Sequence, residues 1–132
     1  MYNYLCNLTV IVLVSFNIAT SIIDNECPKD KENNNVLVLY KDNNLSNTTF
    51  TRLVCKGCMN SEDGYIYWLG HNNTFPNKLS NVTEGEDVTT NLGNDMYKHV
   101  RELNISSLEY TGKNFSCVSM TEYGTTFYYI TL

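Results

Sequence analysis

Short apolar or alternating segments, separated by clusters of Asn, Gly, Asp and Ser, make up most of the chain after residue 35. Segments with this punctuation are typical of β-strands joined by turns, and none of them sustains the helical period of about 3.6 residues. We therefore predict an all-β fold. The expected strands are Val36–Tyr40, Thr49–Cys55, Tyr65–Leu69, Tyr97–Ile105, Asn114–Ser119 and Thr125–Leu132, with one or two short strands within 70–96.

The first residues have the pattern of a targeting segment. Leu8–Ile18 is an apolar run of signal-peptide length, and the small residues Ala19 and Ser21 suit cleavage after position 21. The alternative is an uncleaved membrane anchor, but a bilayer core needs roughly 20 apolar residues and this run is shorter. We predict a signal peptide over 1–21 and one secreted domain over 22–132.

Loss of the signal peptide removes Cys6 and leaves an even set of cysteines, which in a small secreted domain predicts disulfide bonds. Side chains alternate along a strand, so Cys55 and Cys58 face opposite sides of a strand that runs through both. An extended Cys-x-x-Cys is also too stretched to close on itself. We predict the bridges Cys55–Cys117, between two sheets, and Cys27–Cys58, which clips the N-terminal arm. The other connectivities remain open from sequence alone.

Cys55, Trp68 and Cys117 have the order of an immunoglobulin-type β-sandwich. In such domains a cysteine on strand B bridges to one on strand F, and a Trp on strand C packs over the bond. Trp68 follows Cys55 by thirteen residues, which leaves room for a turn and half a strand. Phe115 stands where the tyrosine corner usually places Tyr, so we expect that corner to lack its hydroxyl hydrogen bond. The predicted fold class is a single immunoglobulin-like β-sandwich with two disulfides.

The charge of the chain narrows the choice of partner. The net charge is −5 at pH 7, and all charged residues follow Ser21. An acidic domain without a Lys/Arg cluster argues against nucleic acid or an anionic membrane as the partner. A basic patch on a target protein is compatible with it.

The sequence contains no constellation that predicts catalysis. It has no nucleophile elbow, phosphate loop or zinc-protease motif, so we predict a protein that is not an enzyme, with no catalytic residue and no cofactor. Cys55-Lys-Gly-Cys58 has the spacing of half a zinc site, but a second close ligand pair is missing and an oxidising compartment favours disulfides. His71 and His99 are single residues in polar segments, where we expect them at the surface. The acidic stretch 84–87 is expected to be a solvated loop.

N-glycosylation sequons are frequent and support a secreted, glycan-coated surface. The candidate glycosylation sites are Asn44, Asn47, Asn72, Asn81, Asn104 and Asn114.

Two segments carry more aromatic side chains than a core requires. Alternation directs Ile66 and Trp68 toward the core, which leaves Tyr65 and Tyr67 outside. Outward tyrosines either simply cover the sheet or form a protein-binding face, since rigid amphipathic rings make good anchors. Phe75, in a polar context, adds a third candidate.

The last predicted strand shows a similar excess, because Phe127, Tyr128, Tyr129 and Ile130 make it apolar on both faces. Its outer face is either covered locally or is a second contact surface such as a homodimer seam.

Several motifs together resemble the poxvirus interleukin-18-binding proteins. They follow one another in the order of that family: Cys27-Pro, Cys55-x-Gly-Cys58, Tyr65-x-Tyr67-Trp68-Leu69, Phe75-x-x-x-Leu79 and Phe115-x-Cys117. The resemblance spans roughly Cys27 to Leu132. The Asn-rich composition and the many sequons are more similar to the yatapoxvirus branch than to the orthopoxvirus branch.

The resemblance implies a secreted decoy that covers the receptor-binding surface of host interleukin-18 and dampens inflammatory signalling. Aromatic side chains of one sheet face would insert into pockets on the cytokine. Matched by motif, the partner-binding residues are Tyr65, Tyr67 and Phe75, with Leu79, Glu84 and Glu86 as neighbours. The sequon at Asn72 lies beside this face. The alternative is an immunoglobulin-type adhesion or immunoreceptor-like module that binds a cell-surface protein.

Overall fold

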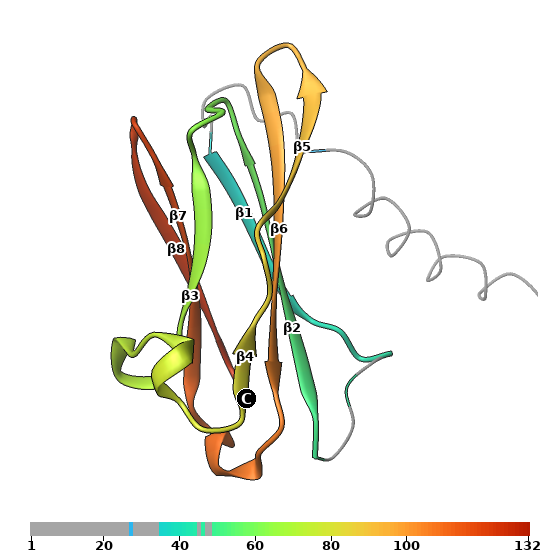
Figure 1. Cartoon of the computed structure of the whole chain (residues 1–132), viewed down its shortest axis with the longest axis vertical. Coiled ribbons are helices and arrows are strands. Elements are labelled where there is room, and N and C mark those ends of the chain that lie inside the picture. Colours follow the sequence, from blue (N-terminus) through green and yellow to red (C-terminus); the bar gives the residue numbers. More distant parts are fainter. Residues whose placement is uncertain (1–26, 28–34, 45, 47–48) are drawn as a thin grey trace, which may run out of the picture.

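The computed structural model describes Cys27, 35–44, 46 and 49–132, and in these residues two antiparallel β-sheets pack face to face (Figure 1). The predicted signal peptide over 1–21 lies outside the described residues. The strands are β1 (Asn35–Lys41), β2 (Thr51–Met59), β3 (Tyr65–Leu69), β4 (Val82–Glu84), β5 (Val88–Gly93), β6 (Met96–Ile105), β7 (Asn114–Thr121) and β8 (Gly124–Thr131). Short 3₁₀ turns are η1 (His71–Asn73), η2 (Pro76–Lys78) and η3 (Leu108–Tyr110).

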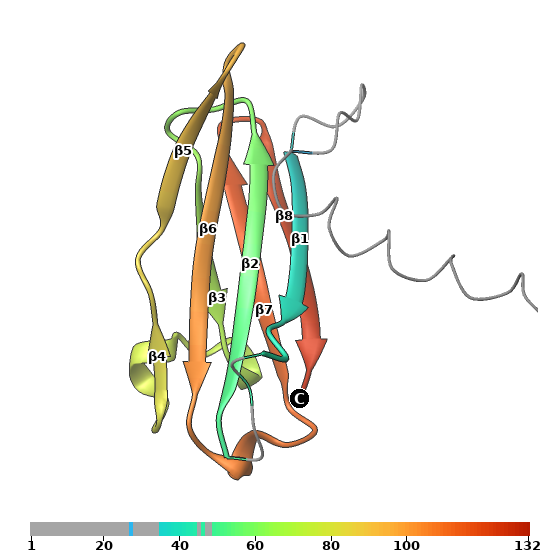
Figure 2. The same ribbon diagram turned by 90° about the vertical axis from the view of Figure 1, so that its right-hand side faces the viewer.

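The strand order is that of an immunoglobulin domain. One sheet has the order β1-β2-β6-β4, with β5 also paired to β6, and the other has the order β3-β7-β8. These correspond to the ABED and CFG sheets of a constant-type domain, with β4 and β5 sharing the place of strand D. Figure 2 shows the larger sheet in front of β3 and β7. The predicted immunoglobulin-like sandwich is confirmed.

The predicted strands agree with the observed ones to within two residues at all ends but one. The exception is β2, which we expected to end at Cys55 and which continues to Met59. The apolar pattern breaks at Lys56-Gly57, yet Gly57 is buried. A Cβ atom there would lie 3.1 Å from Cγ2 of Ile66 on the opposite sheet, so glycine permits a close approach of the two layers.

Both predicted disulfides are confirmed. Cys55 bonds to Cys117 across the sandwich, and Cys27 bonds to Cys58. Trp68 is fully buried and lies opposite Cys117 in the β3–β7 register. Because Cys55 and Cys58 are both oxidised, neither offers the thiolate that a zinc ion needs, and the alternative of a zinc half-site fails.

Phe115 has no hydroxyl for a corner bond, and a tyrosine near it makes a different hydrogen bond. Tyr110, at the end of η3, is buried, and its hydroxyl donates to the carbonyl oxygen of Ser80 at 2.8 Å. Its ring meets that of Phe115 edge to face, with centroids 5.5 Å apart. Burial, and then the neighbouring Glu109, raises the pKa of Tyr110. The donor lies in the loop before β7 and the acceptor 30 positions earlier, so this bond joins two loops and does not replace the corner bond that Phe115 lacks.

Candidate protein-binding face

Three aromatic rings form a continuous row on the outer side of β3, two of them exposed and the middle one, that of Tyr67, half-buried. On β3, Ile66 and Trp68 are both 0% exposed, whereas Tyr65 is 47% exposed. The ring centroids of Tyr65 and Tyr67 are 6.0 Å apart, and those of Tyr67 and Phe75 are 6.2 Å apart. Phe75 is 57% exposed. The structure thus brings Tyr65, Tyr67 and Phe75 together, and we call these three residues the aromatic row.

Phe75 is exposed on a loop that is anchored on both sides. Before it, the N–H of Gly70 donates to the carbonyl oxygen of Thr74 at 2.8 Å. After it, Pro76 is buried and opens η2. Leu79 packs against the core so closely that a Cβ atom on Gly70 would lie 2.2 Å from its Cδ1 atom. The ring of Phe75 therefore projects from a fixed support.

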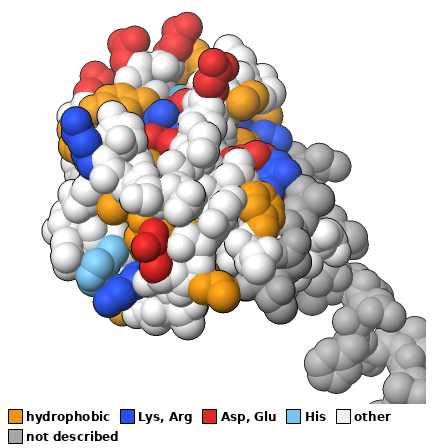
Figure 3. Space-filling view, turned by 60° about the horizontal axis from the view of Figure 1, so that its bottom comes forward, with side chains coloured by type: hydrophobic (Ala, Val, Ile, Leu, Met, Phe, Trp, Pro, Cys, Tyr) orange, Lys and Arg blue, Asp and Glu red, His pale blue; other side chains and the backbone are white. Residues whose placement is uncertain are grey.

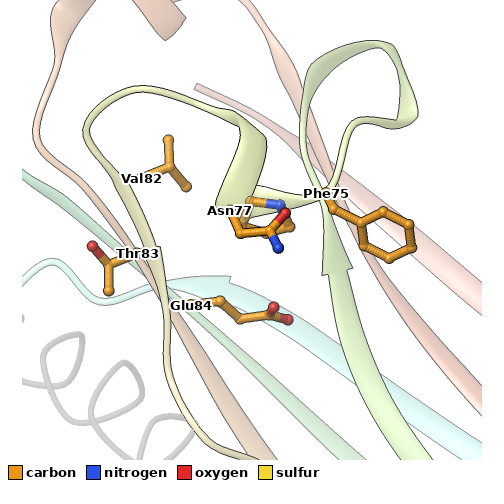
Figure 4. Close-up of a pocket in the computed structure, with 6 residues that line it drawn as sticks. Phe75, Asn77, Val82, Thr83 and Glu84 are labelled. Carbon is orange, nitrogen blue, oxygen red and sulfur yellow. The ribbon is translucent and has the colours of Figure 1, made fainter.

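A hollow of about 310 Å³ adjoins Phe75 between η2 and β4 (Figure 4). In the close-up, the side chain of Glu84 is directed toward β3, and the ring of Phe75 extends away from β4. The remaining lining residues are Pro76, Asn77, Val82 and Thr83. A hollow beside an exposed ring is a suitable place for a side chain of a protein partner.

The outer edge of β3 is occupied by side chains instead of a neighbouring strand. The backbone N–H of Ile66 donates to Asp87 Oδ2 at 3.2 Å, and that of Trp68 donates to Glu84 Oε1 at 2.7 Å. Arg101 Nη1 donates to the carbonyl oxygen of Ile66 at 2.7 Å. Buried backbone groups need such partners, and here they come from strands of the opposite sheet or from the segment joining two of them.

An ion pair and a histidine–carboxylate contact hold these side chains. Arg101 Nε lies 3.1 Å from Glu84 Oε1, and His99 Nδ1 lies 3.0 Å from Asp87 Oδ2. His99 is 1% exposed, so its predicted place at the surface was wrong. The segment 84–87 is likewise not the solvated loop that we expected, because two of its carboxylates bond to β3.

A sequence signal for this buried histidine exists along β6. Leu103 and Ile105 face the core, and alternation puts His99 and Arg101 on the same side of the strand. Polar neighbours concealed that pattern. His71, in contrast, is half-buried in η1.

The other predicted neighbours of the face occupy different environments. Leu79 is half-buried against the core, and Glu84 is half-buried in the contacts with β3 and Arg101. Glu86 is exposed. The aromatic row is therefore one group, and Glu86 lies on the connection between β4 and β5.

The sequons are mostly at the surface. Asn104 is half-buried within β6, and Asn47 lies outside the described residues. The exposed sequon residues are Asn44, Asn72, Asn81 and Asn114.

The outer face of β8 is also apolar and uncovered in the described part of the chain. Phe127 and Tyr129 are both 64% exposed on this face, and Tyr128, which pairs with Cys117 on the inner side, is still 55% exposed. The register places Phe127 opposite Val118, which in turn lies opposite Tyr67. Phe127 thus shares the outer side of the three-stranded sheet with the aromatic row.

In the view of Figure 3, acidic side chains gather along the upper edge, and Lys and Arg are scattered among uncharged groups. This face offers no basic track for a phosphate backbone. Among the described residues, no helix combines the length and the apolar character required to cross a bilayer.

These features define an immunoglobulin-like β-sandwich that presents an exposed aromatic face. The family model described as Yaba-Like Disease Virus IL18BP matches residues 36–126, and the chain belongs to this YLDV-IL18BP-like family. The resemblance to poxvirus interleukin-18-binding proteins is confirmed. A search among curated proteins finds no match.

Proposed function

We propose that this protein is a secreted decoy that binds host interleukin-18 through the aromatic row and prevents the cytokine from engaging its receptor. The name of the family supports the choice of cytokine. The observation that carries the proposal is the row of contacting rings, with centroid distances of 6.0 and 6.2 Å along Tyr65, Tyr67 and Phe75, of which the first and the last are exposed.

The geometry suits tight binding because the rings are already ordered. Fixing a flexible side chain at an interface costs about 0.5–1.5 kcal/mol, and aromatic rings with few rotamers lose less. Tyr67 is flanked by a ring on each side, and Phe75 stands between two anchored turns. The row therefore offers a large apolar surface with little remaining freedom to lose.

The surroundings of the row complete the proposed interface. Glu84 and Glu86 would place negative charge beside it, which suits a partner with basic residues. Leu79 would contribute through its exposed part. A glycan on the exposed Asn72, in the turn between Trp68 and Phe75, would border the footprint on one side.

Secretion and glycosylation belong to the proposal as well. Two disulfides in a domain of this size fit an oxidising compartment. The exposed sequons are accessible to glycosylation there.

Surface plasmon resonance with mature interleukin-18 tests this function. The purified, disulfide-bonded domain should bind interleukin-18 and should not bind an unrelated cytokine. Tyr67→Ala and Phe75→Ala should each weaken binding by about 2 kcal/mol, roughly 30-fold. Tyr123, 71% exposed in the β7–β8 turn, offers a matched aromatic control whose change to Ala should leave affinity intact.

The alternative function predicts a different result. An adhesion or immunoreceptor-like module should bind cells that lack interleukin-18. If the folded domain binds such cells but does not bind interleukin-18, the adhesion or immunoreceptor-like function replaces the decoy function.

A further inference from the structure

We propose that Asp87 and Arg101 are positioning residues for the aromatic row: they cap the outer edge of β3 from the opposite sheet and fix the strand that carries Tyr65 and Tyr67. Their link to cytokine affinity rests on the proposed function. Neither side chain belongs to the aromatic row, so each acts through β3.

The contacts converge on one residue of β3. Ile66 has both backbone polar groups occupied from outside its sheet, the N–H by Asp87 at 3.2 Å and the carbonyl oxygen by Arg101 at 2.7 Å. Ile66 stands between Tyr65 and Tyr67 in the chain. Fixing the two peptide groups of Ile66 therefore fixes the backbone from which both rings project.

Arg101 is itself held in place from several directions. Its Nε donates to the carbonyl oxygen of Gly85 at 2.9 Å and lies 3.1 Å from Glu84 Oε1. The indole Nε1 of Trp68 donates back to the carbonyl oxygen of Arg101 at 3.2 Å. Partial burial strengthens these charge-assisted hydrogen bonds, since the side chain of Arg101 is only 24% exposed.

Asp87 is held on the other side. Its side chain is 17% exposed and contacts His99 Nδ1 at 3.0 Å, while the same carboxylate oxygen accepts from Ile66. Thr89 Oγ1 lies 3.2 Å from the same His99 nitrogen. The carboxylate thus links β6 to the edge of β3.

The interruption of the strand between β4 and β5 makes this arrangement possible. Glu84 and Asp87 are separated by an odd number of positions, and on a continuous strand their side chains would face opposite sides. β4 ends at Glu84 and β5 begins at Val88, so the chain leaves regular geometry between them. Both carboxylates can then turn toward the same edge. The interruption between β4 and β5 therefore allows both carboxylates to bond to the edge of β3.

Capping also determines how a partner can approach. A free edge strand invites another chain to add to its backbone hydrogen bonds. Here both outward backbone groups of Ile66 and the N–H of Trp68 are occupied. A partner therefore contacts the side-chain face of β3 and not its edge.

The test compares Asp87→Ala with Asp87→Asn, using Asp63→Ala, an exposed acidic residue in the turn before β3, as the control for lost charge. NMR amide exchange should accelerate at least about tenfold at Ile66 in Asp87→Ala, because a hydrogen bond of about 1.4 kcal/mol or more is lost there. Exchange at the core residues Leu53 and Leu103 should not change. Nuclear Overhauser contacts between the rings of Tyr67 and Phe75 should weaken.

Affinity for interleukin-18 should fall about fivefold or more in Asp87→Ala, mainly through faster dissociation. Asp87→Asn should restore both readouts to within about twofold, because its amide oxygen can still accept from Ile66. A purely structural role would lower stability without changing the affinity of the folded fraction. Unchanged exchange at Ile66 and Trp68, or faster exchange with full affinity, overturns the proposal.

If Asp87→Ala fails to fold, Arg101→Lys provides the same test. Lysine keeps the charge but lacks the fork that reaches Gly85, Glu84 and Ile66 together. Accelerated exchange at Ile66 with weaker ring contacts supports the proposal, and wild-type exchange overturns it. Failure of the wild-type protein to bind interleukin-18 would refute the proposed function. Amide exchange at Ile66 and the ring contacts would still decide whether Asp87 and Arg101 position the aromatic row.

Discussion

The two edge strands of the three-stranded sheet, β3 and β8, both expose aromatic side chains, yet they differ in how these are held. On β3 the rings contact one another and Phe75, and side chains of the other sheet cap the strand edge. On β8, Phe127 and Tyr129 are more exposed than Tyr65, and among the described residues no ring pair includes them. Exposed aromatic side chains are therefore common to both strands, whereas the ordered support is a property of β3.

The largest expected effect comes from the inner side of β3. Trp68→Ala should reduce the free energy of unfolding by about 3–5 kcal/mol, since it empties a fully buried site and removes the indole bond to Arg101. Tyr128→Ala, on β8, should cost less than about 1 kcal/mol because the ring is 55% exposed. Urea unfolding without reductant measures both. Equal losses of unfolding free energy in the two variants would mean that β3 and β8 contribute equally to stability.

The next largest effect is on interleukin-18 affinity and compares the outer sides of β3 and β8. Tyr67→Ala should weaken interleukin-18 binding by about 2 kcal/mol, whereas Phe127→Ala and Tyr129→Ala should each change affinity less than about twofold. Surface plasmon resonance of the three variants provides the comparison. A large loss from the β8 variants would extend the footprint across the whole sheet.

Tyr110 provides a smaller effect with a defined pH dependence. Tyr110→Phe should cost about 1 kcal/mol near neutral pH, because it removes the hydrogen bond to Ser80. Burial raises the pKa of Tyr110 above its usual value of 10.0, so the unfolded chain releases this proton first as pH rises. The stability advantage of wild type is complete below pH 10 and should shrink above it. A difference in unfolding free energy between wild type and Tyr110→Phe that grows above pH 10 would contradict this prediction.

The smallest effect concerns the homodimer seam, one of the two alternatives for the apolar outer face of β8. If β8 forms this seam, light scattering at micromolar concentration gives a dimer mass, and Phe127→Asp lowers it to that of a monomer, since a buried charge opposes a seam. A monomer mass for the wild-type domain would remove the homodimer and leave β8 as an uncovered edge.

Local alternation predicted much of this molecule. It gave the outward direction of Tyr65 and Tyr67 and the opposed directions of Cys55 and Cys58, and the structure confirms both disulfides. These features depend only on the two-residue period of a strand. The same rule also places His99 inside, because His99 lies on the side of β6 that Leu103 and Ile105 turn toward the core.

The cap of β3 could not be predicted in this way. Arg101 meets Ile66 from a strand 35 positions later, and Glu84 meets Trp68 across 16 positions. Their meeting depends on sheet packing and on an irregular stretch between β4 and β5, which no period describes. The hydroxyl bond of Tyr110 to Ser80 likewise joins two loops that come together only in the folded sandwich.

Hydrogen exchange of the domain, free and saturated with mature interleukin-18, tests whether the cytokine binds to β3 and Phe75. We expect slower exchange over 65–79, which contains β3 and Phe75, and unchanged exchange over 124–131, which contains β8. Slower exchange confined to β8, with 65–79 unaffected, would contradict this expectation.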